Sequence, residues 1–228
     1  MSIELSNKMR AYMAEIYRLI DRQSEQVDYV STSELADLLM VSPPAVNRMV
    51  NKLKELDLLN HEPYQGIAIT DAGRTEALKH IRKHRIAEAF LVQVMGISWL
   101  EAYQEAATLC DGLSDVIVER MYDMAGQPIR CPHGEPIPST DGKIPSIDDI
   151  LLSEAEAGNR YIITRLITRE FDRLQYLEAL GLTPQNEFDV IHVAPFDGPM
   201  QLHLNREYRI IGNNLAQLIR VIPANGND

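Results

Sequence analysis

Four side chains of this chain could hold a transition metal ion, and they come from two short stretches. Cys131 and His133 flank a proline, and His84 and Glu88 stand about one helical turn apart. Thiolate, imidazole and carboxylate groups are ligands of Zn²⁺ and Fe²⁺ in proteins. A cysteine and a histidine this close on a loop have little packing rationale, so the spacing favours a metal site. The alternative is that the pair only orders a proline-rich loop.

These candidate ligands lack the other parts of a catalytic site. The sequence shows no evident general base, nucleophile or oxyanion loop beside them, and no glycine-rich loop that would cradle a phosphate. We therefore expect that the chain is not an enzyme. A structural dimer scaffold with a protein-interaction module is a further alternative.

A second kind of chemistry is indicated between residues 31 and 59, which have the pattern of a helix-turn-helix. Ser31 and Glu34 have the spacing of a capping box, and Ser42 precedes Pro43 at the start of a second helix. The apolar side chains of the second helix repeat at helical spacing and predict a buried face. They are Val46, Met49, Val50, Leu53 and Leu56.

The opposite face of this second helix is a candidate DNA-contacting surface. It carries no carboxylate before Glu55, which suits contacts with phosphates and base edges. We expect Arg48 to read base edges, Ser42 and Asn47 to contact phosphates or bases, and Lys52 to contact the DNA backbone. The full candidate set is Ser42, Pro44, Asn47, Arg48, Asn51 and Lys52. The alternative is a small helical hairpin whose polar face is only solvated.

The residues that follow favour a winged helix. Asn60 to Thr70 has a turn at Gln65-Gly66 and an apolar alternation at Ile67 and Ile69, which is the pattern of a β-hairpin. Tyr64 falls near the wing tip, where we expect it to contact the DNA backbone. An amphipathic helix over residues 6–21 is expected to pack behind this domain.

The rest of the chain predicts two further regions. Residues 71–125 are helical and have more apolar surface than one winged helix can cover. We interpret them as a dimer interface, because two recognition helices are needed to read two half-sites. Residues 126–145 are rich in proline and glycine and predict an ordered loop or linker. Short strands from about residue 160 predict a small β-barrel of SH3-like size.

The predicted fold class is therefore mainly α with a small β domain. An N-terminal winged helix-turn-helix would span residues 1–73, a helical dimerisation and metal-binding domain residues 74–145, and a C-terminal SH3-like β-barrel residues 146–228. A chain of 228 residues with 45% hydrophobic content is long enough for such a division.

The net charge of −11 is unevenly distributed. Residues 1–85 hold 12 basic and 12 acidic side chains, whereas residues 86–228 hold 10 and 21. A neutral winged helix can bind phosphate through one cationic face, but the acidic remainder weakens nonspecific attraction, so we expect salt-dependent binding by a dimer. No apolar run approaches the roughly 20 residues of a membrane span. Two cysteines without secretory features indicate a cytoplasmic location.

The order of these features resembles the diphtheria-toxin-repressor and manganese-transport-regulator family (DtxR/MntR). The winged helix is followed by KHRIAE at Lys83–Glu88, by CPHGEPIP at Cys131–Pro138, and by a terminal small barrel. The FDRLQYLEALGL and APFDGPMQL stretches of the barrel resemble a FeoA-type SH3-like domain. The resemblance covers nearly the whole chain. It implies a cytosolic homodimeric repressor that binds palindromic operators of metal-homeostasis genes when loaded with Mn²⁺ or Fe²⁺.

The resemblance implies two metal sites, and the primary one is incomplete in this sequence. His84 occupies its histidine position, but the ligand positions of the first helix fall on Ala11 and Ala14. A later set at i, i+3 and i+4 falls on Ala107, Cys110 and Asp111. The three potential ligands that remain could still form a site, whose thiolate suits Zn²⁺ or Fe²⁺ better than Mn²⁺. Alternatively, Cys110 is a small buried hydrophobe and Asp111 a solvated acid.

The second site that the resemblance implies is more complete. Its ligands would be Glu88, Cys131 and His133, together with Asp172 (or Glu170) from the barrel. Ligands from three separate segments would clamp the barrel onto the dimerisation domain.

Two inputs remain open for such a repressor. In the leading interpretation, metal binds the DNA-competent state more tightly and so changes operator occupancy. Because Ala11, Ala14 and Ala107 cannot coordinate, the alternative is a repressor that binds DNA without metal. Such a protein could also sense redox state through Cys110 or Cys131.

Overall fold

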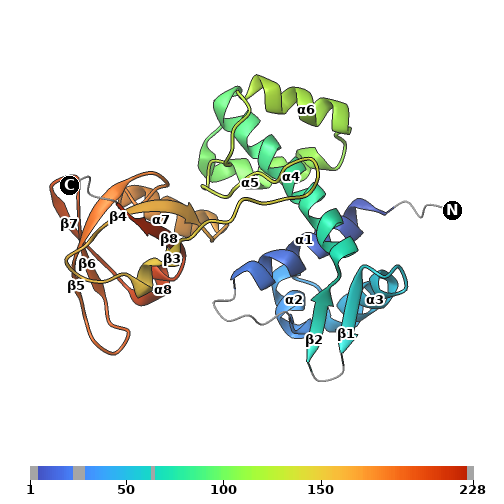
Figure 1. Ribbon diagram of the computed structural model, residues 1–228, viewed down its shortest axis with the longest axis horizontal. Helices are drawn as coiled ribbons and strands as arrows, with labels where there is room; N and C mark the ends of the chain where they lie inside the picture. Colours follow the sequence, from blue (N-terminus) through green and yellow to red (C-terminus); the bar gives the residue numbers. More distant parts are fainter. Residues whose placement is uncertain (1–4, 23–28, 63–64, 225–228) are drawn as a thin grey trace. The chain divides into compact units, whose positions relative to one another are not determined.

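The computed structural model describes residues 5–22, 29–62 and 65–224, and these residues form two compact units. The first unit comprises Met1–Lys83 and Pro138–Ile144, and the second comprises His84–Ile137 and Pro145–Asp228. Figure 1 shows the elements of both units. In the described part of the chain, no helix is long and apolar enough to cross a membrane.

The first unit is a winged helix-turn-helix built on three helices and a hairpin. Its elements are α1 (Asn7–Arg22), α2 (Thr32–Leu39), α3 (Pro43–Lys54), β1 (Leu59–Glu62), β2 (Gly66–Ile69) and the first part of α4 (Asp71–Gln93). The two strands pair antiparallel, and Val30 adds a bridge to Ile67 on the other side of β2. The predicted hairpin after the helix-turn-helix is therefore confirmed.

Local sequence signals fix the ends of the helices in this unit. The hydroxyl of Ser31 accepts a hydrogen bond from the Glu34 N–H at 3.1 Å and caps α2. Ser42 has the extended backbone of an N-cap residue, but its hydroxyl makes no capping bond. Pro43 then begins α3 where no backbone donor is needed. The apolar faces of these helices meet in one core, which includes Met13, Ile16, Leu35, Val46, Val50, Leu53, Leu59, Ile67 and Ile81.

The turn between α2 and α3 places a methionine in a conformation that favours glycine. Met40 has a φ of +51°, and the residue is 91% exposed. A left-handed backbone costs an L-residue about 1–2 kcal/mol, whereas glycine pays roughly 0.5–1 kcal/mol in chain entropy. Met40→Gly is therefore expected to raise the free energy of unfolding by about 0.5 kcal/mol, measured from the urea midpoint.

A matched substitution in a right-handed helical residue should have the opposite sign. Lys52 is exposed within α3, so Lys52→Gly is expected to lower the free energy of unfolding by about 0.7 kcal/mol. A loss of stability in both variants would contradict the role assigned to the Met40 backbone.

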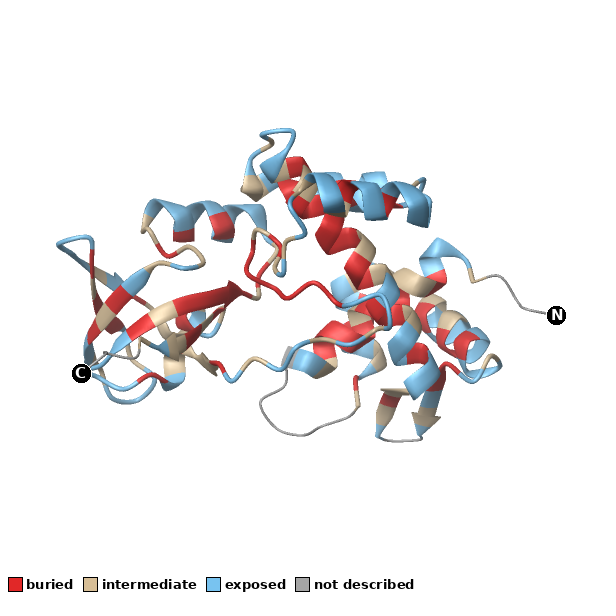
Figure 2. Cartoon of the chain, turned by 45° about the horizontal axis from the view of Figure 1, so that its top comes forward, coloured by how far each residue is buried: buried red, intermediate tan, exposed pale blue. Residues whose placement is uncertain are grey.

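The second unit combines a helical layer with an antiparallel sheet. Its helical part comprises α4 from His84 onward, α5 (Trp99–Cys110) and α6 (Asp115–Met124). These helices share a core that includes Ile86, Ala89, Leu91, Ala106, Cys110, Val118 and Met121. Residues 81–91 of α4 are almost all buried, as the red stretch of that helix shows in Figure 2.

The six strands of the second unit are ordered β3-β8-β4-β5-β6-β7, and all neighbours are antiparallel. Their bounds are β3 (Ile150–Leu151), β4 (Arg160–Leu166), β5 (Glu187–Val193), β6 (Met200–Leu204), β7 (Glu207–Ile211) and β8 (Ile219–Pro223). The helix α7 (Phe171–Ala179), the 3₁₀ turn η1 (Leu152–Glu154) and the short helix α8 (Asn213–Ala216) complete this part. The predicted class, mainly α with a small β domain, is confirmed.

Candidate metal centre

Three predicted ligands lie together inside the second unit. Glu88 comes from α4, and Cys131 and His133 come from the loop between α6 and β3. Their ligand atoms all lie within 4.8 Å of one another, and all three residues are buried. Nδ1 of His133 lies 2.8 Å from Oε2 of Glu88. The cluster offers one sulfur, one nitrogen and one oxygen ligand, a mixed set that suits a borderline transition metal ion.

A tight turn of the loop positions the two ligands from this segment. The Cys131 N–H donates to the Glu135 carbonyl at 2.9 Å, and the Gly134 N–H donates to the Cys131 carbonyl at 2.9 Å. Gly134 has a φ of +85°, and a Cβ built on it would lie 2.0 Å from the carbonyl oxygen of Thr164. The His133 carbonyl accepts a hydrogen bond from the Leu166 N–H. Only glycine lets the turn approach the end of β4 this closely.

His84 orients the carboxylate of Glu88 from the preceding turn of α4. Its Nδ1 lies 2.8 Å from Oε1 of Glu88, so the two carboxylate oxygens face two different imidazoles. The His84 ring also contacts the ring of Tyr103, with centroids 4.6 Å apart. The His133 ring contacts Trp99 of α5 in a similar way, with centroids 5.3 Å apart. Both imidazoles therefore pack against an aromatic ring of α5.

The electrostatics of the centre keep the carboxylate charged and the thiol protonated. Burial would raise the pKa of Glu88, but the hydrogen bonds from His133 and His84 hold it well below its usual range. Burial raises the pKa of Cys131 to about 12, and the charge of Glu88 contributes to this rise. A metal ion that binds Cys131 must therefore displace the thiol proton.

The surroundings of one imidazole nitrogen indicate whether a metal ion fits these residues. Nε2 of His133 is buried, and it finds no hydrogen-bond partner within the residues that the structure describes. An imidazole nitrogen left in this state is costly unless something coordinates it or bonds to it. Together with the buried carboxylate and thiol, this atom fits a site for a divalent transition metal.

The other predicted ligands do not join this cluster. Cys110 is buried in the core of the helical layer, whereas Asp111 is exposed at the C-terminus of α5. Asp172 is exposed in the first turn of α7, and Glu170 forms an exposed ion pair with Arg173. Across the described ranges, only Glu88, Cys131 and His133 form a group of three or more potential ligands. The structure therefore does not assemble the predicted set of His84, Cys110 and Asp111, nor does it bring in Asp172.

Alanine stands at three positions where the resemblance implies ligands of the primary site. Ala11 and Ala14 lie in α1, and Ala107 lies in α5. An alanine side chain has no atom that can coordinate a metal. His84 lies against Glu88 instead, with its Nδ1 2.8 Å from Oε1 of that carboxylate.

The candidate DNA surface of α3 is accessible. Ser42, Pro44, Asn47, Arg48, Asn51 and Lys52 are all exposed. Tyr64, which was predicted to lie near the wing tip, falls outside the described residues.

A network of buried and half-buried charges near the centre was not predicted from the sequence. Arg85 donates to Glu135 at 2.9 Å, and Arg169 lies 3.4 Å from the other carboxylate oxygen of Glu135. Arg165 is bound to Asp149 at 2.9 Å and reaches Glu135 at 3.4 Å. The only sequence signal was the position of Glu135 within the same short segment as Cys131 and His133.

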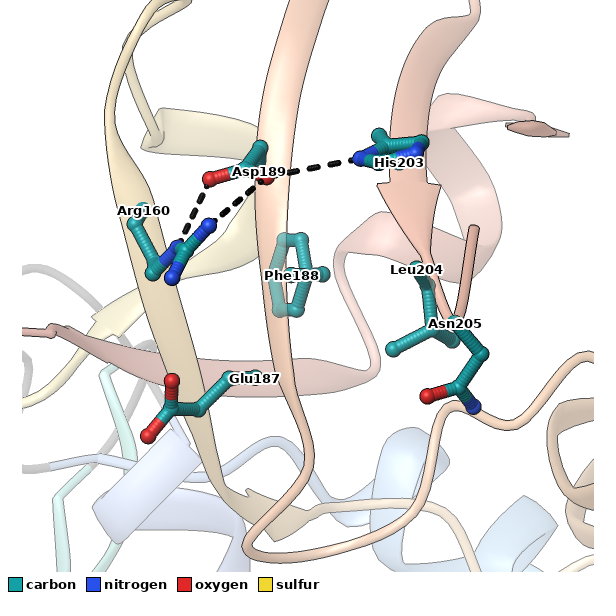
Figure 3. Close-up of a pocket in the computed structure, with 7 residues that line it drawn as sticks. All are labelled: Arg160, Glu187, Phe188, Asp189, His203, Leu204 and Asn205. Carbon is teal, nitrogen blue, oxygen red and sulfur yellow. Dashed lines mark hydrogen bonds and ion pairs between the residues drawn. The ribbon is translucent and has the colours of Figure 1, made fainter. Parts of the chain in front are cut away.

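A separate hollow of about 170 Å³ opens on the sheet, and Figure 3 shows its lining. Arg160 makes two hydrogen bonds to Asp189, at 2.8 and 3.2 Å, and His203 lies 3.5 Å from the same carboxylate. The guanidinium of Arg160 and the imidazole of His203 thus already face the Asp189 carboxylate. None of the residues that line this hollow belongs to the candidate metal centre.

Comparison with known families divides the chain into three matched segments. Residues 4–67 match the iron dependent repressor N-terminal DNA binding domain. Residues 70–139 match the iron dependent repressor metal binding and dimerisation domain. Residues 150–223 match the FeoA domain.

Individual relatives agree with these segments. An uncharacterized HTH-type transcriptional regulator of Methanocaldococcus jannaschii is 38% identical over 117 residues, which cover 51% of this chain and 91% of that protein. The iron-dependent repressor IdeR of Mycobacterium tuberculosis is 27% identical over 230 residues, covering 96% of this chain and 98% of the relative.

Solved structures extend the similarity to the whole architecture. A manganese-dependent transcriptional repressor in complex with manganese has a TM-score of 0.87 at 29% identity, covering 94% of this chain and 99% of that one. ScaR with bound Zn²⁺ has a TM-score of 0.80 at 32% identity, with 94% and 98% covered. With a winged helix, a dimerisation segment and a FeoA domain in this order, the chain belongs to the iron-dependent repressor (DtxR/MntR) family of transcriptional regulators.

Proposed function

We propose that this protein is a homodimeric repressor that binds palindromic operators of metal-homeostasis genes in response to a divalent transition metal in the cytoplasm. The observation that carries the proposal is the buried group of Glu88, Cys131 and His133 in a member of this family. The ion would hold α4 to the loop that packs on β4. If the ion binds the DNA-competent dimer more tightly than the other state, it shifts the equilibrium toward that dimer by the difference in binding free energy.

The donor set narrows the choice of metal. Relatives are named as iron-dependent or manganese-dependent repressors, and one solved relative carries Zn²⁺. A thiolate beside an imidazole and a carboxylate favours Fe²⁺ or Zn²⁺ over Mn²⁺. Fe²⁺ is therefore the metal that agrees best with both the names of the relatives and the chemistry of the three ligands.

The dimer would form through the helical layer of the second unit. This segment matches a metal binding and dimerisation domain, and α5 and α6 leave large apolar side chains exposed. These are Leu109, Val116, Ile117 and Met124, with Val116 at 82% exposure. A second copy of the chain would cover this surface and place two α3 helices for two half-sites.

A direct measurement tests the proposal. The metal content of the purified protein is determined beside its affinity for operator DNA, with and without chelator, and after titration with Fe²⁺, Mn²⁺ and Zn²⁺. We expect one ion per chain at this centre and tight operator binding only with metal. Equal affinity for operator DNA in every condition would contradict the metal-responsive function.

A second candidate function is a repressor that binds DNA without metal. The alanines at positions 11, 14 and 107 favour it, because they remove the donors of the first site. A redox input through the cysteines is less compatible with the structure. Cys110 and Cys131 are both buried, and a reactive thiol requires an accessible site and a lowered pKa, whereas the pKa of Cys131 is raised to about 12.

The recognition surface gives a prediction of its own. If Arg48 contacts a base edge, Arg48→Ala should cost about 1–3 kcal/mol on the operator and much less on scrambled DNA. Lys52→Ala is the matched control, because a phosphate contact weakens binding to both DNAs and lowers the salt slope by about 1. Affinity measurements at several salt concentrations separate the two. Equal losses on both DNAs for Arg48→Ala would contradict base readout.

A further inference from the structure

Arg169 is held rigidly beside the metal centre. Its Nη1 donates to the carbonyl oxygens of Leu166 at 2.9 Å and of Thr168 at 2.8 Å. Its guanidinium carbon lies 5.3 Å from the centre of the Tyr103 ring, and its side chain is only 13% exposed. A guanidinium cannot lose its proton in a protein, so this position carries a permanent positive charge.

Two neighbouring residues connect Arg169 to the centre. Tyr103, on which the guanidinium lies, also contacts the ring of His84. Glu135, which Arg169 reaches at 3.4 Å, accepts the Cys131 N–H through its carbonyl. Although burial lowers the pKa of Arg169, the charges of Glu135 and Glu88 raise it above the usual arginine value. Through Tyr103 and Glu135, Arg169 therefore lies one residue away from the groups of the centre.

The two carboxylates and two arginines at the centre balance one another before any metal binds. Glu88 and Glu135 carry negative charges, and Arg85 and Arg169 carry positive ones. Next to them, Arg165 and Arg220 share the single carboxylate of Asp149, so this neighbouring cluster adds no negative charge. A divalent ion brings two positive charges. Even after the Cys131 proton leaves to solvent, one positive charge remains in excess, and an uncompensated buried charge is costly.

We propose that Arg169 is a built-in competitor of the metal ion, which sets the affinity of the centre formed by Glu88, Cys131 and His133. The inference rests on the proposed metal site and specifies how that site is regulated. In the apo protein the guanidinium neutralises the acidic groups of the centre. In the metal-bound protein it repels the ion, so the site fills only at a higher free metal concentration.

The test is a competition titration of the full-length protein with Zn²⁺ and Fe²⁺ against a chromophoric chelator, the iron under anaerobic conditions. Arg169→Gln removes the charge and is expected to tighten metal binding about tenfold or more, a change of about 1.4 kcal/mol, because like charges repel each other in a protein. Arg173→Gln is the matched control. Arg173 lies on the exposed surface of α7, paired with Glu170, so its removal should change metal affinity by less than about twofold.

A second variant keeps the inference falsifiable if Arg169→Gln folds poorly. Glu135→Gln removes a negative charge and leaves the arginines in place, so it should weaken metal binding about tenfold or more. Opposite signs in the two variants support charge competition. Unchanged or weaker binding in Arg169→Gln with a native circular dichroism spectrum, or tighter binding in Glu135→Gln, overturns it. If Cys131→Ser binds metal like the unmodified protein, the proposed site itself fails, which is a separate result.

Discussion

Gly134→Ala is expected to detach the ligand-bearing turn from β4 and to abolish metal binding at the centre. The new Cβ would lie 2.0 Å from the Thr164 carbonyl oxygen and 2.8 Å from the Cα of Arg165, so backbone must move. The residue would also keep a φ of +85°, which costs an L-residue about 1–2 kcal/mol. Overpacking adds about 1–3 kcal/mol, so we expect a loss of about 2–5 kcal/mol in the free energy of unfolding.

The measurement is denaturant unfolding of the protein with excess chelator, followed by metal titration of the folded variant. Gly126→Ala is the matched control, because Gly126 has a similar φ of +77° and no atom within 4 Å of the added Cβ. It should lose only the backbone part, about 1–2 kcal/mol, and retain metal binding. Equal stability losses in the two variants would show that the turn does not depend on its close contact with β4.

Cys131→Ser is expected to weaken Zn²⁺ or Fe²⁺ binding by about 100-fold or more. Loss of a residue that only orients a ligand typically costs about 10–100-fold in metal affinity, and a direct thiolate ligand should cost at least the upper end of that range. The substitution changes little in volume, so the fold should survive. Operator binding should then become insensitive to added metal while its affinity in chelator stays unchanged.

Cys110→Ser is the control that separates the two predicted sites. Cys110 packs in the core of the helical layer and joins no group of three potential ligands in the described ranges. Its replacement should cost about 1–2 kcal/mol of stability through the buried hydroxyl, with metal affinity nearly unchanged. A loss of metal binding in Cys110→Ser and not in Cys131→Ser would place the functional site at the incomplete primary position.

The elements of the fold could be predicted because their signals are local. The Ser31 cap marks the start of α2, and Pro43 with the apolar repeat that follows marks α3. Alternation of apolar and polar residues marks β5 and β6. The pairing of the ligands was harder, since His133 is 45 residues from Glu88 in the sequence. Only the resemblance to a family predicted that Glu88 lies close to Cys131 and His133.

The rest of the centre could not be predicted because it depends on which charged residues meet across long separations. Arg85 and Glu135 are 50 residues apart, and Arg169 lies 34 residues beyond Glu135. Periodicity marks a face as polar but does not pair its charges. The same limit explains Asp172, which has the right chemistry and position in sequence but is exposed on α7.

The contact between Trp99 and His133 gives the protein an intrinsic optical reporter. Trp99 is the single tryptophan of the chain, and its ring centroid lies 5.3 Å from that of a candidate ligand. Its fluorescence therefore comes from one place, and a change in the charge or coordination of the neighbouring imidazole would alter the emission directly. Occupancy of the centre could be followed in real time by this emission, without any label.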